Sequence, residues 1–119
     1  MQRLSFFLCA FVITVSIHAN GDSLVCEILG DTTKRVQCTY FSERVAHDRN
    51  ITFTWRSPSL QADQRERTIT LNAHHGSLYD YRYYYGRAPG EWEVLVSENG
   101  TKLASTRFEI KESEEDKEY

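Results

Sequence analysis

The chain has 119 residues, of which 40% are hydrophobic and 26% charged, and its formal net charge is −3. This length is typical of one domain with a single core. The slightly acidic balance argues against the basic stripe that a nucleic-acid-binding protein needs to neutralise phosphates, so we expect no nucleic-acid partner.

The first 19 residues have the pattern of a secretory signal peptide. Arg3 precedes an apolar run from Leu4 to Ile17 that is too short to span a bilayer comfortably. We expect cleavage after Ala19, no membrane insertion of the mature chain and a secreted, extracellular protein; an uncleaved anchor is the alternative. Residues 20–110 are expected to form one domain, and residues 111–119, acidic and without apolar periodicity, a disordered tail.

Two cysteines, Cys26 and Cys38, follow the leader, and an even pair in an oxidising compartment predicts a disulfide. A hairpin that places them opposite each other also aligns the apolar alternation of both strands. In that register three apolar pairs share one face: Leu24 with Tyr40, Cys26 with Cys38, and Ile28 with Val36. A thiol-based metal site would need two further ligands, so we expect no metal and no cofactor.

Two N-glycosylation acceptor sequences begin at Asn50 and Asn99. Asn50 opens a predicted strand in which Ile51, Phe53 and Trp55 point inward while the asparagine faces solvent. Asn99 lies at a hairpin tip. We expect a glycoprotein whose glycosylated faces are not the partner-binding surface.

Histidines occur in two predicted connections, His47 beside Asp48 in the loop 41–49 and His74 with His75 in the turn 72–76. Neither a nucleophile elbow nor a clustered ligand set accompanies them, so we predict no catalytic and no metal-binding residues. The alternative is a small secreted hydrolase or metal-dependent enzyme that uses these histidines with Asp48 or Asp80.

The segment from Leu78 to Tyr85 contains five tyrosines and is predicted to be a strand, after a polar linker (57–66) and a shorter strand (67–71). One face carries Tyr79, Tyr81, Tyr83 and Tyr85, and the other carries Leu78, Asp80, Arg82 and Tyr84. We expect the tyrosine face to lie on the core with its hydroxyls at the rim. The alternative is an exposed aromatic platform for recognition.

The C-terminal segment predicts a hairpin whose strands meet at Asn99-Gly100. Trp92, Val94 and Val96 share a face that must be buried. A two-residue turn places Trp92 opposite Arg107, so we expect a β-bulge between Ala104 and Arg107 that returns Phe108 and Ile110 to the core.

About six or seven short strands with turns between them predict an all-β antiparallel sandwich with one disulfide. The Pro-Gly turn, the Trp-x-Val-x-Val strand and the strand ending Phe-x-Ile resemble the last two strands of immunoglobulin-like and fibronectin-like extracellular domains. The resemblance implies an immunoglobulin-like sandwich.

These features predict a non-enzymatic binding protein that recognises another extracellular or cell-surface protein. Tyrosine and arginine are the residues that most often dominate interface energetics. The expected partner-binding residues are therefore Tyr79, Tyr81, Arg82, Tyr83, Tyr84, Tyr85 and Arg87. A further alternative is a structural subunit whose sheet edge is completed by a strand from a partner.

Overall fold

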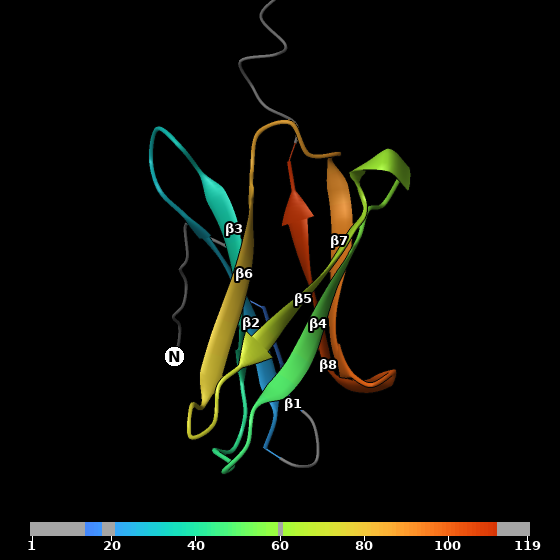
Figure 1. Cartoon of the computed structure of the whole chain (residues 1–119). Coiled ribbons are helices and arrows are strands. Elements are labelled where there is room, and N and C mark those ends of the chain that lie inside the picture. The colour runs from blue at the N-terminus through green and yellow to red at the C-terminus, as the bar shows by residue number, and fades with distance from the viewer. Residues whose placement is uncertain (1–13, 18–20, 60, 112–119) are drawn as a thin grey trace, which may run out of the picture.

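The computed structural model describes residues 14–17, 21–59 and 61–111. Within these residues the protein is all-β, and its strands form two antiparallel sheets that pack face to face (Figure 1). The first sheet contains β1 (Thr14–Ile17), β2 (Ser23–Leu29), β3 (Arg35–Phe41) and β6 (Ser77–Tyr83), in that order. The second contains β5 (Arg65–Leu71), β4 (Arg49–Arg56), β7 (Gly90–Glu98) and β8 (Thr101–Ile110).

The predicted sandwich is confirmed, with seven strands between Ser23 and Ile110 divided three and four between the sheets. Strand β1 belongs to the segment predicted as the leader, and it pairs antiparallel with the outer edge of β2. The predicted cleavage after Ala19 and the tail beyond Lys111 lie outside the described residues and stay predictions. No helix in the described part of the chain is long and apolar enough to cross a bilayer.

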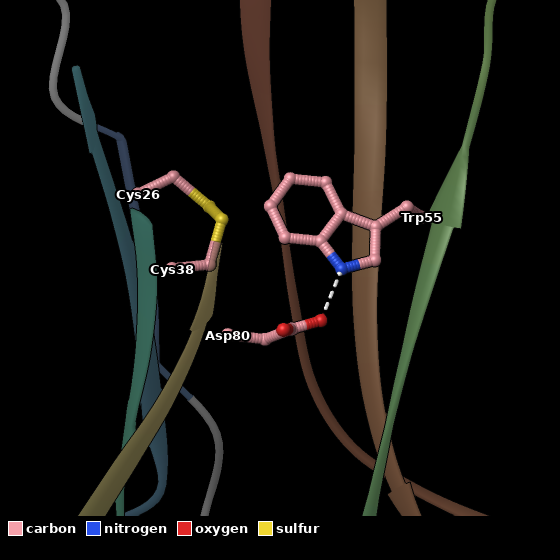
Figure 2. The surroundings of a disulfide bond; sticks show 4 residues. All are labelled: Cys26, Cys38, Trp55 and Asp80. Atoms are coloured by element: carbon pink, nitrogen blue, oxygen red, sulfur yellow. Dashed lines mark hydrogen bonds between the residues drawn. A yellow bond between two sulfur atoms is a disulfide. The ribbon is translucent and has the colours of Figure 1, made fainter. Parts of the chain in front are cut away.

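The hairpin of β2 and β3 has the register that its alternation predicts. Leu24 lies opposite Tyr40, Cys26 opposite Cys38, and Ile28 opposite Val36. The two cysteines form a disulfide, and their Cα atoms are 4.0 Å apart. The disulfide therefore joins neighbouring strands of one sheet, and its sulfur atoms point toward the second sheet (Figure 2).

Aromatic side chains fill the centre of the sandwich. Trp55 on β4 and Trp92 on β7 are both fully buried. Phe108 on β8 stacks on Trp92 and meets Trp55 edge to face, with 6.0 Å between ring centroids in each pair. The indole nitrogen of Trp92 donates a hydrogen bond of 2.8 Å to the carbonyl of Ala88, so its one polar atom is satisfied.

The β7–β8 hairpin turns at Asn99 and Gly100, which both have positive φ angles, as predicted. Its bulge is also present, but the predicted position between Ala104 and Arg107 is wrong. The register shifts at Leu103, after the first two residue pairs beyond the turn, so Val96 faces Ala104 and Trp92 faces Phe108. A shift this early brings the whole inward row of β8 into phase with the core: Ala104, Thr106, Phe108 and Ile110.

The predicted polar linker between β4 and β5 is more structured than expected. A short 3-10 helix, η2 (Gln61–Asp63), occupies it, and β5 already begins at Arg65 rather than at Arg67. Asp63 at the end of η2 is buried, which the polar sequence around it did not indicate.

Candidate functional site

Strand β6 lies at the edge of the first sheet, and its tyrosine face points outward. Tyr79, Tyr81 and Tyr83 are 54%, 36% and 55% exposed. The expectation that this face would lie on the core is therefore wrong. Pairing with β3 sets Asp80 opposite Cys38, so the buried row of β3 continues into the opposite face of β6.

Asp80 is the charged side chain that this orientation buries. Its side chain is fully buried, and it accepts a 2.9 Å hydrogen bond from the indole nitrogen of Trp55 (Figure 2). Arg65 and Arg67 reach it from β5 with N–O distances of 3.1 and 3.0 Å. A buried carboxylate is tolerated only when it is paired and hydrogen-bonded, and these three donors meet that condition.

Arg82, two residues further along β6, is also turned inward. Its guanidinium lies 5.9 Å from the ring centroid of Trp55 and 5.5 Å from that of Trp92. It donates to the backbone carbonyl of Asp63 at 2.6 Å and to the carboxylate at 3.3 Å. Burial, together with the charges of Arg87 and Arg65, lowers the pKa of Arg82 below its usual value.

Asp63 holds the connection between β6 and β7 in place. Its carboxylate accepts a hydrogen bond of 2.8 Å from the backbone nitrogen of Ala88 and forms an ion pair with Arg87 at 2.9 Å. The sequence gives no signal for this role, since Asp63 lies in a polar stretch and its partners follow 19 to 25 residues later.

A pocket opens where β5 and β6 face each other along one side of the sandwich. Its volume is about 220 Å³. We call it the arginine pocket, and its lining consists of four arginines and two tyrosines: Arg65, Arg67, Arg82, Arg87, Tyr81 and Tyr83. Asp63 and Asp80 are the carboxylates bonded to these arginines, so positive charge exceeds negative charge here by two.

The outer face of β6 adjoins this pocket. Tyr81 and Tyr83 make an edge-to-face contact with 5.8 Å between centroids, and the guanidinium of Arg35 lies 5.5 Å from the Tyr81 centroid. Tyr79 continues the row along β6. We call this exposed row of Tyr79, Tyr81 and Tyr83 the tyrosine face.

The remaining residues of the predicted patch divide between surface and interior. Tyr85 follows β6 and is half exposed. Tyr84 packs against the core, donates its backbone nitrogen to the carbonyl of Lys34 at 2.9 Å, and accepts a bond from the backbone nitrogen of Lys111 at 3.0 Å. Tyr84 therefore fastens the end of β6 to its neighbours.

Both predicted glycosylation asparagines belong to the second sheet. Asn50 is exposed on β4, where its side-chain oxygen accepts a hydrogen bond of 3.1 Å from Thr70 on β5. Asn99 is exposed at the β7–β8 turn. Neither lies on the first sheet, whose outer surface carries the tyrosine face.

The three histidines of the two loops lie at one end of the sandwich. His47, His74 and His75 are exposed, and their loops are joined by a 2.7 Å bond from the backbone nitrogen of His74 to the carbonyl of Val45. Asp48 accepts a bond of 2.8 Å from the backbone nitrogen of Ala73 and so stabilises the turn. In the described ranges, no group of three or more His, Cys, Asp and Glu side chains is placed to hold a metal ion.

A larger hollow of about 690 Å³ is lined by residues that include Arg49 and Glu98. Arg49 pairs with Glu98 at 2.9 Å and also donates to the hydroxyl of Ser42 at 2.9 Å. The bond to Glu98, and to a smaller extent a bond to the hydroxyl of Tyr40, raises the pKa of Arg49 above its usual value. This hollow therefore differs from the arginine pocket, because its arginine is already matched by a carboxylate.

Comparison with known proteins identifies no matching family model, no similar curated protein and no similar solved structure.

Proposed function

We propose that the protein is a secreted, N-glycosylated binding domain, immunoglobulin-like or fibronectin-like in topology, that recognises another extracellular or cell-surface protein and catalyses no reaction. The strand order supports this topology. One layer consists of β2, β3 and β6, and the other of β5, β4, β7 and β8. The chain crosses between the layers three times, as in Greek-key sandwiches of extracellular proteins.

The observation that carries the proposal is the exposure of the tyrosine face. Three exposed tyrosines in one row form a continuous aromatic surface, and tyrosine combines a wide contact area with little loss of rotamer entropy on binding. The strand that presents these tyrosines is fastened to the rest of the sandwich by the inward hydrogen bonds of Asp80 and Arg82. A preorganised aromatic row of this kind is suited to recognising a protein surface.

Two further features are consistent with an extracellular role. The disulfide is typical of proteins that fold in an oxidising compartment. Glycans on Asn50 and Asn99 would project from the second sheet, so the tyrosine face on the first sheet would stay accessible.

The proposal is tested by capturing partners on cells with the tagged, secreted protein and a double variant, Tyr79→Ala with Tyr83→Ala. Loss of two interface tyrosines should weaken capture by at least about tenfold. Lys102→Ala with Glu109→Ala, both exposed on β8, is the control. Equal capture by the tyrosine variant and the wild type, with unchanged near-UV circular dichroism, would refute the proposed surface.

A second candidate function is completion of the first sheet by a strand from a partner. The observation in its favour is that the edge strand β2 already accepts a strand, β1. Their pairing runs from Ile17 opposite Ser23 to Thr14 opposite Cys26. Cleavage after Ala19 would open this edge. Hydrogen exchange of the β2 amides in the processed protein should then slow when a partner strand binds, and unchanged exchange in the captured complex would exclude strand addition at β2.

A further inference from the structure

The arginine pocket contains donors that the protein itself does not satisfy. The Nε atoms of Arg65 and Arg87 are buried and have no hydrogen-bond partner among the described residues. One terminal nitrogen of each side chain is bonded, that of Arg65 to Asp80 and that of Arg87 to Asp63. Buried polar atoms without a partner are rare in folded proteins, because each costs the free energy of its lost hydration.

The charge of the pocket points in the same direction as its unused donors. Four guanidinium groups surround two carboxylates within a small volume, whereas the chain as a whole is slightly acidic. Each carboxylate is already shared between two arginines. The pocket therefore has an unmatched positive charge and would be stabilised by an anion.

The size and position of the pocket restrict what that anion can be. A volume of about 220 Å³ admits a single small anionic group. A planar guanidinium binds a carboxylate through two parallel hydrogen bonds, so an aspartate or glutamate side chain of a partner protein supplies a matching group. Tyr81 and Tyr83 belong both to the pocket wall and to the tyrosine face, so a partner seated on that face can extend an acidic side chain into the pocket.

We propose that the arginine pocket binds the carboxylate of an acidic side chain on the protein that occupies the tyrosine face. This inference depends on the proposed function, since it specifies the chemistry of the same partner. A sulfated polysaccharide fits less well, because it would require a basic stripe along the surface rather than one confined pocket.

The test uses nuclear magnetic resonance of the disulfide-bonded protein and follows the arginine Nε–H signals. The probes are a capped pentaglutamate peptide, a capped pentaglutamine peptide and a heparin hexasaccharide. Pentaglutamate should shift the Arg65 and Arg87 signals saturably, and added salt should weaken its binding. Pentaglutamine should leave both signals unchanged. The absence of a saturable shift with pentaglutamate, an equal shift with pentaglutamine, or a shift with the hexasaccharide alone would overturn the inference.

A matched pair of variants locates the site. Arg67 and Arg56 are 54% and 55% exposed, and only Arg67 lines the pocket. Arg67→Gln should weaken pentaglutamate binding by about tenfold, whereas Arg56→Gln should leave it unchanged. Equal effects of the two variants would contradict a discrete site. The peptide assay needs no natural partner, so its result does not depend on the cell-capture assay. Each proposal can therefore be refuted while the other holds.

Discussion

Replacing Asp80 by alanine tests the central contact of the fold and of the candidate site together. Asp80 lies on β6 of the first sheet and bonds to Trp55 on β4 and to Arg65 and Arg67 on β5 of the second sheet. The change removes all three of these contacts between the sheets. It leaves the disulfide and the backbone pairing of β6 in place. The loss of stability therefore measures how much this buried carboxylate contributes.

The magnitude follows from what each partner loses. The indole nitrogen of Trp55 is left in a dry interior without an acceptor, which costs about 1 to 3 kcal/mol. Arg65 and Arg67 are 36% and 54% exposed and can turn toward water, so each lost ion pair adds less than about 1 kcal/mol. We expect Asp80→Ala to lower the free energy of unfolding by about 3 kcal/mol in total. Asp80→Asn keeps an oxygen for Trp55 and should cost less.

The assay is urea unfolding followed by tryptophan fluorescence, with the slope of the transition checked for a change in mechanism. Glu91→Gln is the control, because Glu91 is 65% exposed and its pair with Arg107 spans 3.7 Å. That variant should change stability by less than about 0.5 kcal/mol. If Asp80→Ala lies within about 1 kcal/mol of the wild type, or if Asp80→Asn is equally damaging, the role assigned to this carboxylate is refuted.

Three further outcomes are expected. Phe108→Ala should lower stability by about 3 to 5 kcal/mol in urea unfolding, since the ring fills the space between Trp55 and Trp92, and a loss below about 1 kcal/mol would contradict its central packing. A double alanine variant of the disulfide, Cys26–Cys38, should lose about 3 kcal/mol because the unfolded chain gains freedom, and unchanged stability would contradict this. Burial raises the pKa of the Tyr40 hydroxyl, so the unfolded chain releases this proton first and stability should fall as the pH rises above about 10. Tyr40→Phe should show a shallower fall in the same pH titration, and equal slopes would exclude this residue as a cause.

The sequence was sufficient for those parts of the fold in which two local patterns agree. Around Cys26 and Cys38 the apolar alternation and the cysteine spacing require the same register, and that register is present. The hairpin at Asn99-Gly100 is local in the same sense, because the turn residues and the flanking strands are adjacent in the chain. The position of its bulge is not fixed by these local signals, because one extra residue anywhere between the turn and Phe108 returns Phe108 and Ile110 to the core.

The orientation of β6 could not be predicted from β6 alone. The polarity of the side chains predicts that Asp80 and Arg82 face solvent and that the tyrosines face the core. Their burial is made favourable by groups from distant strands, including the indole of Trp55 and the carbonyl of Asp63. The arginine pocket was missed for the same reason, because Arg65 and Arg67 precede Arg82 and Arg87 by a whole strand and a turn.

The placement of the disulfide has a mechanical consequence. Because the bond joins β2 to β3 within one layer, the described part of the chain has no covalent cross-link between the layers apart from the backbone connections. A pulling force that separates the two sheets is resisted by side-chain packing and by the salt-bridge cluster around Asp80, and the bond bears none of that load. Reducing agents should therefore loosen the β2–β3 ribbon while leaving the force that parts the layers almost unchanged.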